Sequence, residues 1–431
     1  MNIYIKVEVR DREFLSRLLL GATSALKGNN VLIGDDEVLE LVEKKKLNPG
    51  IILEKSISPV KRRIKQLKNY KNNNCVVTSI DEEGGLAQVK YKDFANRRYS
   101  YETLAYADKI FCWGNYDYSN NIKLFPKAKK KFLITGNPRF DLLDNKIAKN
   151  FVKRKKSKFN KIVIISSYMV FTRSKSFSDQ FSVNEKFKDD YFYDHFSHRA
   201  AMSSNYIKLL KKIIEEFPKF EIDIWIHPNE SIKNWKKILP NKKNINFTFG
   251  EKFILKEKND KTIYIHSGSG LAFNAILQEK IVISYQPIKS NWNNTLPNVN
   301  SIKIKSDKEF INFLKQKKMR NFKPNNSHIK ILHRLIDNSK RYDACEKIAS
   351  YWENFNNDKL NIKNNLSKII IKNKIRLIRQ SMKYRIYNKK FPPFTRDELL
   401  KLKKILFRYN PKFKKLKFSL IGPKLINISK L

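Results

Sequence analysis

Two polar loops that follow apolar runs constrain the fold of this chain more than any other feature. The segment Thr262–Leu277, TIYIHSGSGLAFNAIL, is an apolar run that stops at a glycine- and serine-rich loop before a helical pattern begins. Upstream, Ile222–Ser231, IDIWIHPNES, is a second apolar run that ends in a polar loop. Hydroxyls and backbone N–H groups between a strand and a helix suit a phosphate, and open α/β sheets bind ligands at the carboxyl ends of strands. The pattern predicts a nucleotide or nucleotide-sugar site.

The residues assigned to this nucleotide site come from both loops. An imidazole can donate a hydrogen bond to a phosphate, and the Ser-Gly-Ser-Gly run offers hydroxyls and backbone N–H groups. A single histidine at a strand end is more often structural, so the assignment depends on the two loops together. The candidates are His227, Pro228, Glu230, His266, Ser267, Gly268, Ser269 and Gly270.

Strand and helix signals alternate along most of the chain. Short apolar runs such as Ile3–Val9, Val31–Gly34 and Cys75–Ile80 are followed by helical spacing, and a second series begins at Lys161 after a basic linker. This alternation predicts parallel sheets with helices on both faces. We expect an α/β protein with two doubly wound, Rossmann-like domains in a GT-B-like arrangement. The domains are an acceptor and sugar domain (1–150), a nucleotide-binding domain (151–355) and a basic helical tail (356–431), which lies on a membrane surface or packs on the first domain.

Composition indicates a globular protein of a reducing compartment. Hydrophobic residues make up 41% and charged residues 30% of 431 residues. The N-terminus lacks a signal-peptide layout, and no apolar run approaches the roughly 20 residues of a membrane span, so we expect a cytoplasmic location. Cys75, Cys112 and Cys345 have no metal-ligand spacing and are interpreted as free buried thiols.

The net charge of +48 has two interpretations. In the first interpretation, genome bias alone could supply much of the excess, because the abundant Lys, Asn and Ile are the residues of AT-rich codons. The charge is also concentrated, because residues 361–431 hold 16 Lys and five Arg against Asp397 and Glu398. Such a tail suits the inner face of an anionic membrane, where segments such as Leu366–Arg379 mix Ile and Leu with cations, or nucleic acid.

An acidic loop follows the predicted strand Cys75–Ile80. Asp81, Glu82 and Glu83 precede two glycines, and crowding of carboxylates raises at least one pKa, which suits a general acid or base. The alternative is an exposed loop that caps the next helix. The position at the end of a central strand, in a basic chain, favours a catalytic role.

A second strand-end loop, Gly136–Asp141, combines backbone constraint with charge. Asn137 and Arg139 could bind substrate, the arginine by gripping a carboxylate or phosphate bidentately. Asp141 could act as a nucleophile or charge stabiliser at an anomeric carbon, or it could simply cap a helix. Arg10 and Arg12, after the first strand, could hold an acidic sugar if that loop opens on the same cleft. No Asp-x-Asp metal motif is present, so we expect a reaction without a metal or resident cofactor.

Five motifs together resemble the bacterial surface carbohydrate biosynthesis proteins. These are SIDEEGG, ADKIFCWG, ITGNPRFDLL, WIHPNE and HSGSGLAFNAIL, which span roughly residues 1–290. That family looks related to GT-B transferases that use CMP-activated keto sugars, including retaining Kdo transferases. The resemblance implies that His227, Ser267 and Ser269 contact CMP, that Glu82 or Glu83 is the acid/base, and that Asp141 is the nucleophile of a double displacement.

Three functions therefore compete. The first is a glycosyltransferase of surface polysaccharide synthesis with a CMP-activated, Kdo-like donor and a glycan or lipid-linked acceptor. The second is a CDP-glycerol-type glycerophosphotransferase on the same fold, whose members share the Gly-x-Pro-Arg-x-Asp and His-Pro patterns. The third is a non-catalytic basic protein that binds nucleic acid or membrane, and the absence of a recognised nucleic-acid module argues against it.

Overall fold

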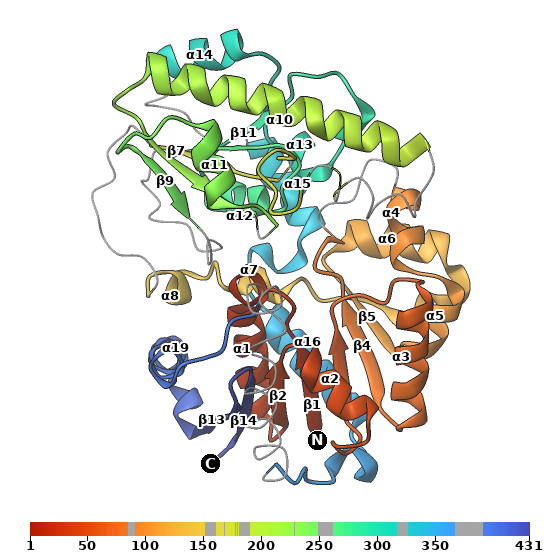
Figure 1. The fold of residues 1–431 in the computed structure, drawn as a ribbon. Helices are drawn as coiled ribbons and strands as arrows, with labels where there is room; N and C mark the ends of the chain where they lie inside the picture. Colours follow the sequence, from red (N-terminus) through yellow and green to blue (C-terminus); the bar gives the residue numbers. More distant parts are fainter. Residues whose placement is uncertain are drawn as a thin grey trace.

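The protein consists of two sheets of mainly parallel strands, each flanked by helices (Figure 1). The computed structural model describes residues 1–84, 91–150, 161–248 apart from 168, 177, 179, 181–189 and 228, and then 262–316, 326–366 and 391–431. Pro228, most of the predicted linker and nearly all of the segment 366–379 lie outside the described residues. Both termini lie in the first domain, at the bottom of Figure 1.

The first sheet has the order β13-β14-β2-β1-β3-β4-β5-β6. Its parallel strands are β1 (Asn2–Lys6), β2 (Asn30–Gly34), β3 (Ile51–Glu54), β4 (Val76–Ile80), β5 (Lys109–Cys112) and β6 (Phe132–Ile134). The intervening helices are α1 (Arg10–Leu26), α2 (Asp36–Glu43), α3 (Lys61–Asn72), α4 (Tyr91–Arg98), α5 (Tyr101–Tyr106) and α6 (Asn115–Leu124). Strand β1 pairs with β2 on one side and β3 on the other. The strand order reverses there, which makes a topological switch point.

The second sheet has the order β12-β11-β10-β7-β8-β9. Its strands are β7 (Lys161–Ile165), β8 (Glu221–Trp225), β9 (Ile245–Thr248), β10 (Ile263–His266), β11 (Ile281–Tyr285) and β12 (Ile302–Ile304). Helices α10 (Asp190–Glu216), α11 (Ile232–Ile238), α12 (Leu271–Leu277), α13 (Leu296–Val299) and α14 (Asp307–Lys315) accompany them. Strand β7 lies between β8 and β10, so a second switch point lies beside β7.

The predicted α/β class with two Rossmann-like domains is confirmed. Runs such as IVISY in β11 are buried at every position, as expected for parallel strands covered on both faces. The predicted strands Ile3–Val9, Val31–Gly34 and Cys75–Ile80 overlap β1, β2 and β4, although β1 ends at Lys6. The three cysteines are free and buried, as expected.

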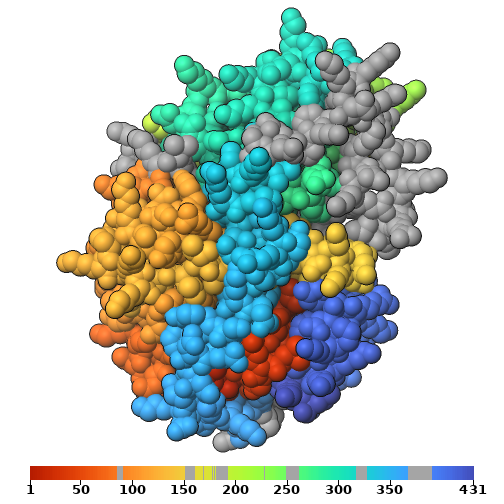
Figure 2. Space-filling model, turned by 180° about the vertical axis from the view of Figure 1, so that it is seen from behind, coloured from red at the N-terminus to blue at the C-terminus, as the bar shows by residue number. Residues whose placement is uncertain are grey.

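One segment returns from the second domain to the first. It comprises α15 (Asn326–Leu335), a 3₁₀ turn η6 (Asp337–Ser339) and α16 (Ala344–Trp352), and it runs down across both domains in Figure 2. Helix α16 packs against α1 and buries Trp352, whose indole N–H donates to the Thr78 hydroxyl at 3.3 Å. The assignment of residues 344–352 to the second domain therefore needs correction, since their apolar face is buried by the first.

The end of the tail is a β-hairpin rather than a helix. After α19 (Arg396–Tyr409) come η9 (Pro411–Lys415), β13 (Leu416–Gly422) and β14 (Leu425–Lys430). Strand β14 pairs antiparallel with β2 and so extends the first sheet. The prediction of a helical tail was wrong for this part. Apolar residues alternate on either side of Gly422-Pro423, and this pattern is typical of a hairpin. The described part of the tail thus packs on the first domain.

Candidate functional site

The glycine- and serine-rich loop after β10 lies at the switch point of the second sheet. The Ser267 side chain is buried, its hydroxyl donates to the carbonyl oxygen of Tyr285 at 2.7 Å, and its own carbonyl accepts from the Ser167 hydroxyl at 3.0 Å. Gly268 has a φ of +74° and donates its N–H to Asn298 at 2.6 Å. Gly268, Ser269 and Gly270 are half-buried. Ser267 therefore shapes the loop, and the next three residues are the part that a ligand can reach.

His266 supports this loop from inside the protein. Its side chain is fully buried, its Nδ1 accepts from the backbone N–H of Ser269 at 3.3 Å, and its Nε2 lies 2.9 Å from the Ser301 hydroxyl. Burial lowers the pKa of His266 to about 3, so the imidazole is neutral at pH 7. The assignment of His266 as a nucleotide contact is corrected: it fixes the backbone conformation instead.

The loop after β8 also contains one residue that a ligand can reach and one that is buried. His227 is half-buried, and its Nδ1 accepts from the backbone N–H of Asn229 at 3.2 Å, which puts the proton of the neutral ring on Nε2. The Glu230 side chain is buried, with its carboxylate 2.6 Å from the Ser166 hydroxyl and 2.9 Å from the indole nitrogen of Trp235. Burial raises the pKa of Glu230 to about 7. Glu230 therefore ties β7 to α11, in place of the ligand contact expected from the sequence.

The acidic loop after β4 contains one reachable carboxylate and two buried ones. Asp81 and Glu82 are buried, whereas the Glu83 side chain is 38% exposed. Asp81 accepts the backbone N–H of Glu83 at 2.7 Å, and burial raises its pKa to about 6. Burial also opposes ionisation of Glu83, but the paired guanidinium of Arg98 outweighs it and lowers the pKa of Glu83. A protonatable carboxyl and an ionised one thus occupy the same turn.

Glu82 is held within the protein by a cation from α1. It pairs with Arg17, whose side chain is also buried, and Nε and Nη1 of Arg17 meet no acceptor among the described residues. A carboxylate locked against a buried guanidinium is poorly placed to exchange protons with a substrate. Of the two glutamates predicted as the acid/base, the structure therefore favours Glu83.

A fourth carboxyl, Asp117, was missed by sequence reasoning. It lies in the first turn of α6, after β5, and accepts the backbone N–H of Trp113 at 3.3 Å. Burial, together with the nearby charge of Asp81, raises the pKa of Asp117 to about 8. The sequence contained a signal, because the carboxyl ends of neighbouring strands β4 and β5 must lie side by side, and Trp113-Gly114 marks the end of β5.

Arg139 connects the two halves of the site. It lies in α7 (Pro138–Asp141) after β6, and its Nη2 donates to the carbonyl oxygen of Gly270 at 3.2 Å and to Asn274 of α12 at 3.0 Å. Its guanidinium lies 5.4 Å from the centre of the Trp113 ring, and the Trp113 indole N–H donates to the carbonyl oxygen of Asp81 at 2.7 Å. Burial lowers the pKa of Arg139 to about 10, so it stays charged at pH 7. The predicted substrate-binding arginine is a bridge between the domains.

Asn137 and Asp141 serve the fold rather than the reaction. Asn137 is fully buried and caps α7 by accepting the backbone N–H of Arg139 at 3.0 Å. The Asp141 side chain is buried and accepts the backbone N–H groups of Ala344 and Cys345, at 3.1 and 2.7 Å, and the amide of Asn338 at 2.6 Å. The prediction that Asp141 is a nucleophile is therefore corrected: its carboxylate caps the N-terminus of α16.

The structure separates the two arginines that follow β1. Arg10 donates to the carbonyl oxygens of Pro392 and Pro393, at 3.0 and 2.9 Å, and pairs with Glu398 at 2.7 Å. It anchors the tail, so its assignment to substrate is corrected. Arg12 pairs with Glu13, keeps 32% of its side chain exposed, and lies near enough to Glu82 and Glu83 to feel their charge. Arg12 remains a candidate for substrate binding.

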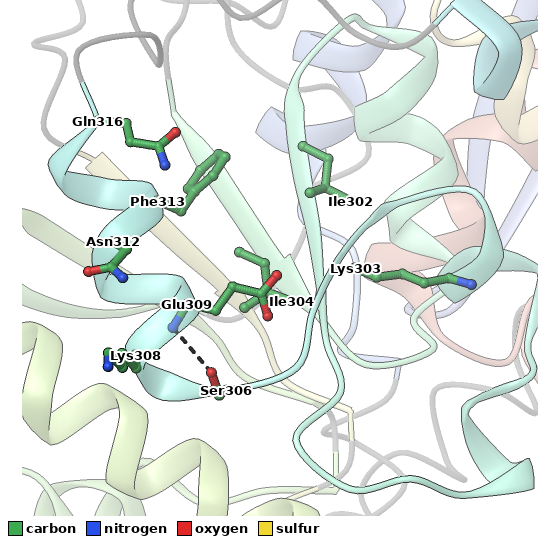
Figure 3. A pocket seen from close by; sticks show the side chains of 9 residues that line it. All are labelled: Ile302, Lys303, Ile304, Ser306, Lys308, Glu309, Asn312, Phe313 and Gln316. Carbon is green, nitrogen blue, oxygen red and sulfur yellow. Dashed lines mark hydrogen bonds between the residues drawn. The ribbon is translucent and has the colours of Figure 1, made fainter.

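The described residues line a cavity of about 430 Å³ at the carboxyl ends of β1, β2 and β3. A second hollow of about 470 Å³ lies at the edge strand β12 beside α14, where the hydroxyl of Ser306 caps the helix by accepting the N–H of Glu309 at 3.2 Å (Figure 3). None of the residues predicted for the site lines this second hollow. None of them lines the first cavity either, but that cavity opens at the switch point beside β1.

Within the described part of the chain, no three His, Cys, Asp or Glu side chains are grouped as metal ligands. None of the helices in this part has the length and apolar composition needed to span a bilayer. A reaction without a metal stays a prediction.

Comparison with known proteins supports the fold. No protein-family model and no curated protein matches the chain. Its fold is similar to that of the UDP-GlcNAc 2-epimerase from Neisseria meningitidis, with 14% identity and a TM-score of 0.50 over 82% of this chain and all of that one. Weaker likenesses are to S. aureus MnaA (12%, TM-score 0.49, 82% and 96% covered) and to the wall teichoic acid polymerase TagF (10%, 0.48, 82% and 88%). The neisserial likeness shows the two-domain GT-B-type fold; at this identity it carries no function.

We predict that Asp117→Asn makes stability less dependent on pH. Between about pH 4 and 8 the folded state keeps a proton on Asp117 that the unfolded state has released, so the free energy of unfolding falls as pH rises. The substitution removes this pH dependence. From pH 5 to pH 8, the free energy of unfolding of the variant should therefore rise on the order of 2 kcal/mol relative to that of the unsubstituted protein. Urea unfolding at a series of pH values measures it.

The control for this experiment is Asp358→Asn, which changes an exposed aspartate and should leave the pH profile unchanged. Parallel profiles for Asp117→Asn and the unsubstituted protein would mean that Asp117 is ionised in the folded state.

Proposed function

We propose that this protein is a GT-B-type enzyme of surface polysaccharide synthesis that transfers an acidic, Kdo-like keto sugar from a CMP-activated donor to a glycan or lipid-linked acceptor. The observation that carries the proposal is the position of Arg139. It contacts the Gly270 loop of one domain and lies beside Trp113, which holds the acidic loop of the other. Groups suited to a nucleotide phosphate and groups suited to acid–base catalysis are thus built around one side chain.

In this proposal the donor phosphate lies against the half-buried loop Gly268–Gly270. The Ser269 hydroxyl and the loop backbone would bind phosphate oxygens, and His227 would donate from Nε2 to the phosphate or the leaving nucleotide. Ser267 and His266 would hold the loop in shape from behind.

The proposed catalytic group is Glu83, which is ionised and reachable. Asp81 is buried, pairs with Arg98 and accepts the backbone N–H of Glu83, so it holds the turn that presents Glu83. Arg12, part-exposed beside the acidic loop, would receive the carboxylate of the sugar. A double displacement through Asp141 is not part of the proposal, because that carboxylate is occupied by α16.

The CDP-glycerol alternative uses the same groups with a different donor. Arg139, His227 and the Ser269 loop would serve a glycerophosphotransferase equally well, so the chemical product separates the two.

We predict that CMP raises the melting temperature of the protein more than UMP, CDP or UDP at equal concentration. A ligand that binds the folded state stabilises it by about 2.7 kcal/mol at 100 times its Kd. Ser269→Asp, which places a carboxylate in the proposed phosphate loop, should weaken CMP binding at least tenfold by calorimetry.

Ser306→Asp is the matched control, because it makes the same change at another helix start of the same domain, where Asp is an equally good cap. Preference for uridine nucleotides would contradict the CMP donor, and binding of none of the four would contradict the enzyme.

We predict that the protein releases CMP from CMP-Kdo and that Glu83→Gln lowers this turnover at least 100-fold. Loss of a general acid or base has effects of about this size. CMP affinity should stay within twofold, and Glu102→Gln, an exposed glutamate on α5, should leave turnover unchanged. Transfer of glycerol phosphate from CDP-glycerol, without CMP release from CMP-Kdo, would establish the alternative.

We also propose that the tail lies on an anionic membrane surface. Lys401, Lys404 and Arg408 are exposed on one face of α19, next to Leu400, which is 52% exposed. Deletion of residues 361–431 would be a poor test, because it removes β14 from the first sheet and uncovers β2.

Charge reversal is the cleaner experiment. We expect Lys401→Glu, Lys404→Glu and Arg408→Glu together to reduce sedimentation with phosphatidylglycerol vesicles at least fivefold, with CMP binding unchanged. The same reversal at Lys127, Lys129 and Lys130, exposed in η2 (Pro126–Lys131), is the control. Equal loss in both variants would indicate a response to net charge and contradict a specific surface.

A further inference from the structure

The cavity at the carboxyl ends of β1, β2 and β3 lies at the switch point of the first sheet. Its volume of about 430 Å³ is within the range of small-molecule sites. Strands β1, β2 and β3 are parallel and in register, so the loops that follow them meet at one edge. We call this cavity the β1–β3 pocket; it is lined by Lys6, Val7, Glu8, Asp35, Asp36, Ser58, Val60, Arg62, Arg63, Gln66 and Phe391.

The charges of the β1–β3 pocket are balanced, in contrast to the rest of the chain. Three lining residues are cationic and three are anionic, whereas the whole chain carries +48. Three partners lie outside the lining: Lys55 pairs with Glu8, Lys424 with Asp35 and Glu54 with Arg63. With these included, five cationic side chains meet four anionic ones, so the pocket stays close to neutral. The balance of charge therefore favours an uncharged ligand.

The polar groups of the pocket are held in place by neighbours. Lys6 is buried and pairs with Asp36, and Arg63 pairs with Glu54, which is fully buried at the end of β3. Asp35 caps α2 and lies 3.3 Å from Lys424 of the tail. Burial opposes ionisation of Lys6, but Glu54 and Asp36 outweigh it and raise the pKa of Lys6, so its ammonium stays charged. A ligand finds these groups already oriented.

The pocket combines these groups with apolar surface. Val60 is 55% exposed at the start of α3, and Val7 and the ring of Phe391 also line the pocket. Donors and acceptors together with apolar surface match a sugar ring, whose hydroxyls both donate and accept while its C–H face is apolar. A purely apolar ligand would leave the charged groups unsolvated.

The pocket lies next to the acidic loop. Lys55 pairs with Glu8 of the pocket, and the charge of the same lysine acts on Asp81 and Glu83. The charge of Lys55 therefore acts both on a residue that lines the pocket and on the acidic loop.

We propose that the β1–β3 pocket binds an uncharged sugar residue of the acceptor. That the sugar belongs to the acceptor rests on the proposed function. That the ligand is a sugar rests on the charge and the lining of the pocket. It adds a second substrate site, in the first domain, and it makes the tail part of that site through Phe391.

The test is saturation-transfer NMR with sugars that differ in charge, on the full chain without nucleotide. Glucose and N-acetylglucosamine are the uncharged probes, and glucuronate and glucosamine are their anionic and cationic counterparts. We expect transfer to an uncharged probe and at least fivefold weaker transfer to both charged ones. Val60→Trp, which fills the pocket from an exposed position, should reduce transfer at least tenfold.

Leu400→Trp, the same change at an exposed site on α19, is the control and should have no effect. If Val60→Trp fails to fold by circular dichroism, Arg62→Ala decides, with an expected loss of at least threefold. No transfer to either uncharged probe, equal transfer to the charged ones, or transfer that survives both pocket variants would overturn the proposal. CMP binding on the same samples reports on the proposed function separately: CMP bound without sugar contradicts the pocket alone, and sugar bound without CMP contradicts the donor.

Discussion

The arrangement of this protein depends on a buried cation, Arg139, placed between its two sheets. A guanidinium taken out of water is costly unless its donors are used, and this one donates to the Gly270 carbonyl and to Asn274 in the other domain. Because the same side chain lies beside Trp113, one residue contacts both the loop after β10 and the ring that holds the acidic loop. Loss of Arg139 would therefore change the position of the loop after β10 relative to the acidic loop more than it would change either loop alone.

A second constraint comes from the segment that returns to the first domain. Asn338 exchanges hydrogen bonds with the backbone of Asn137, accepting at 3.0 Å and donating at 2.9 Å, and also donates to Asp141. Gly136 has a φ of +79°, and a Cβ at this position would lie 2.2 Å from the Asn338 side chain, so only glycine fits. The loop Gly136–Asp141, predicted from the sequence to be catalytic, therefore binds the returning segment. These contacts set the position of Arg139.

The sequence predicted the strands and their end loops well, because continuous apolar runs and glycine-rich ends are local properties. It predicted the chemistry of the individual polar residues less well, since that depends on partners distant in the chain. Asp141 resembles a strand-end catalytic aspartate until α16, some 200 residues later, donates its first N–H groups to it. Asp117 drew no attention, although burial beside Asp81 gives it an unusual pKa. The hairpin of the tail was not predicted, because its many lysines suggested a basic helix although alternate residues are apolar.

Each sheet offers its ligand surface at the same topological place, but the two surfaces differ in chemistry. The second sheet presents hydroxyls, glycine backbone and a histidine tautomer with its proton on Nε2, all suited to an anion. The first presents paired charges that nearly cancel, next to a loop in which burial raises the pKa of Asp81 to about 6. In a chain with a net charge of +48, a balanced pocket requires that acidic residues be concentrated locally, as Glu8, Asp35 and Asp36 are. The local distribution of charge, and not its total, therefore carries the information about what this protein binds.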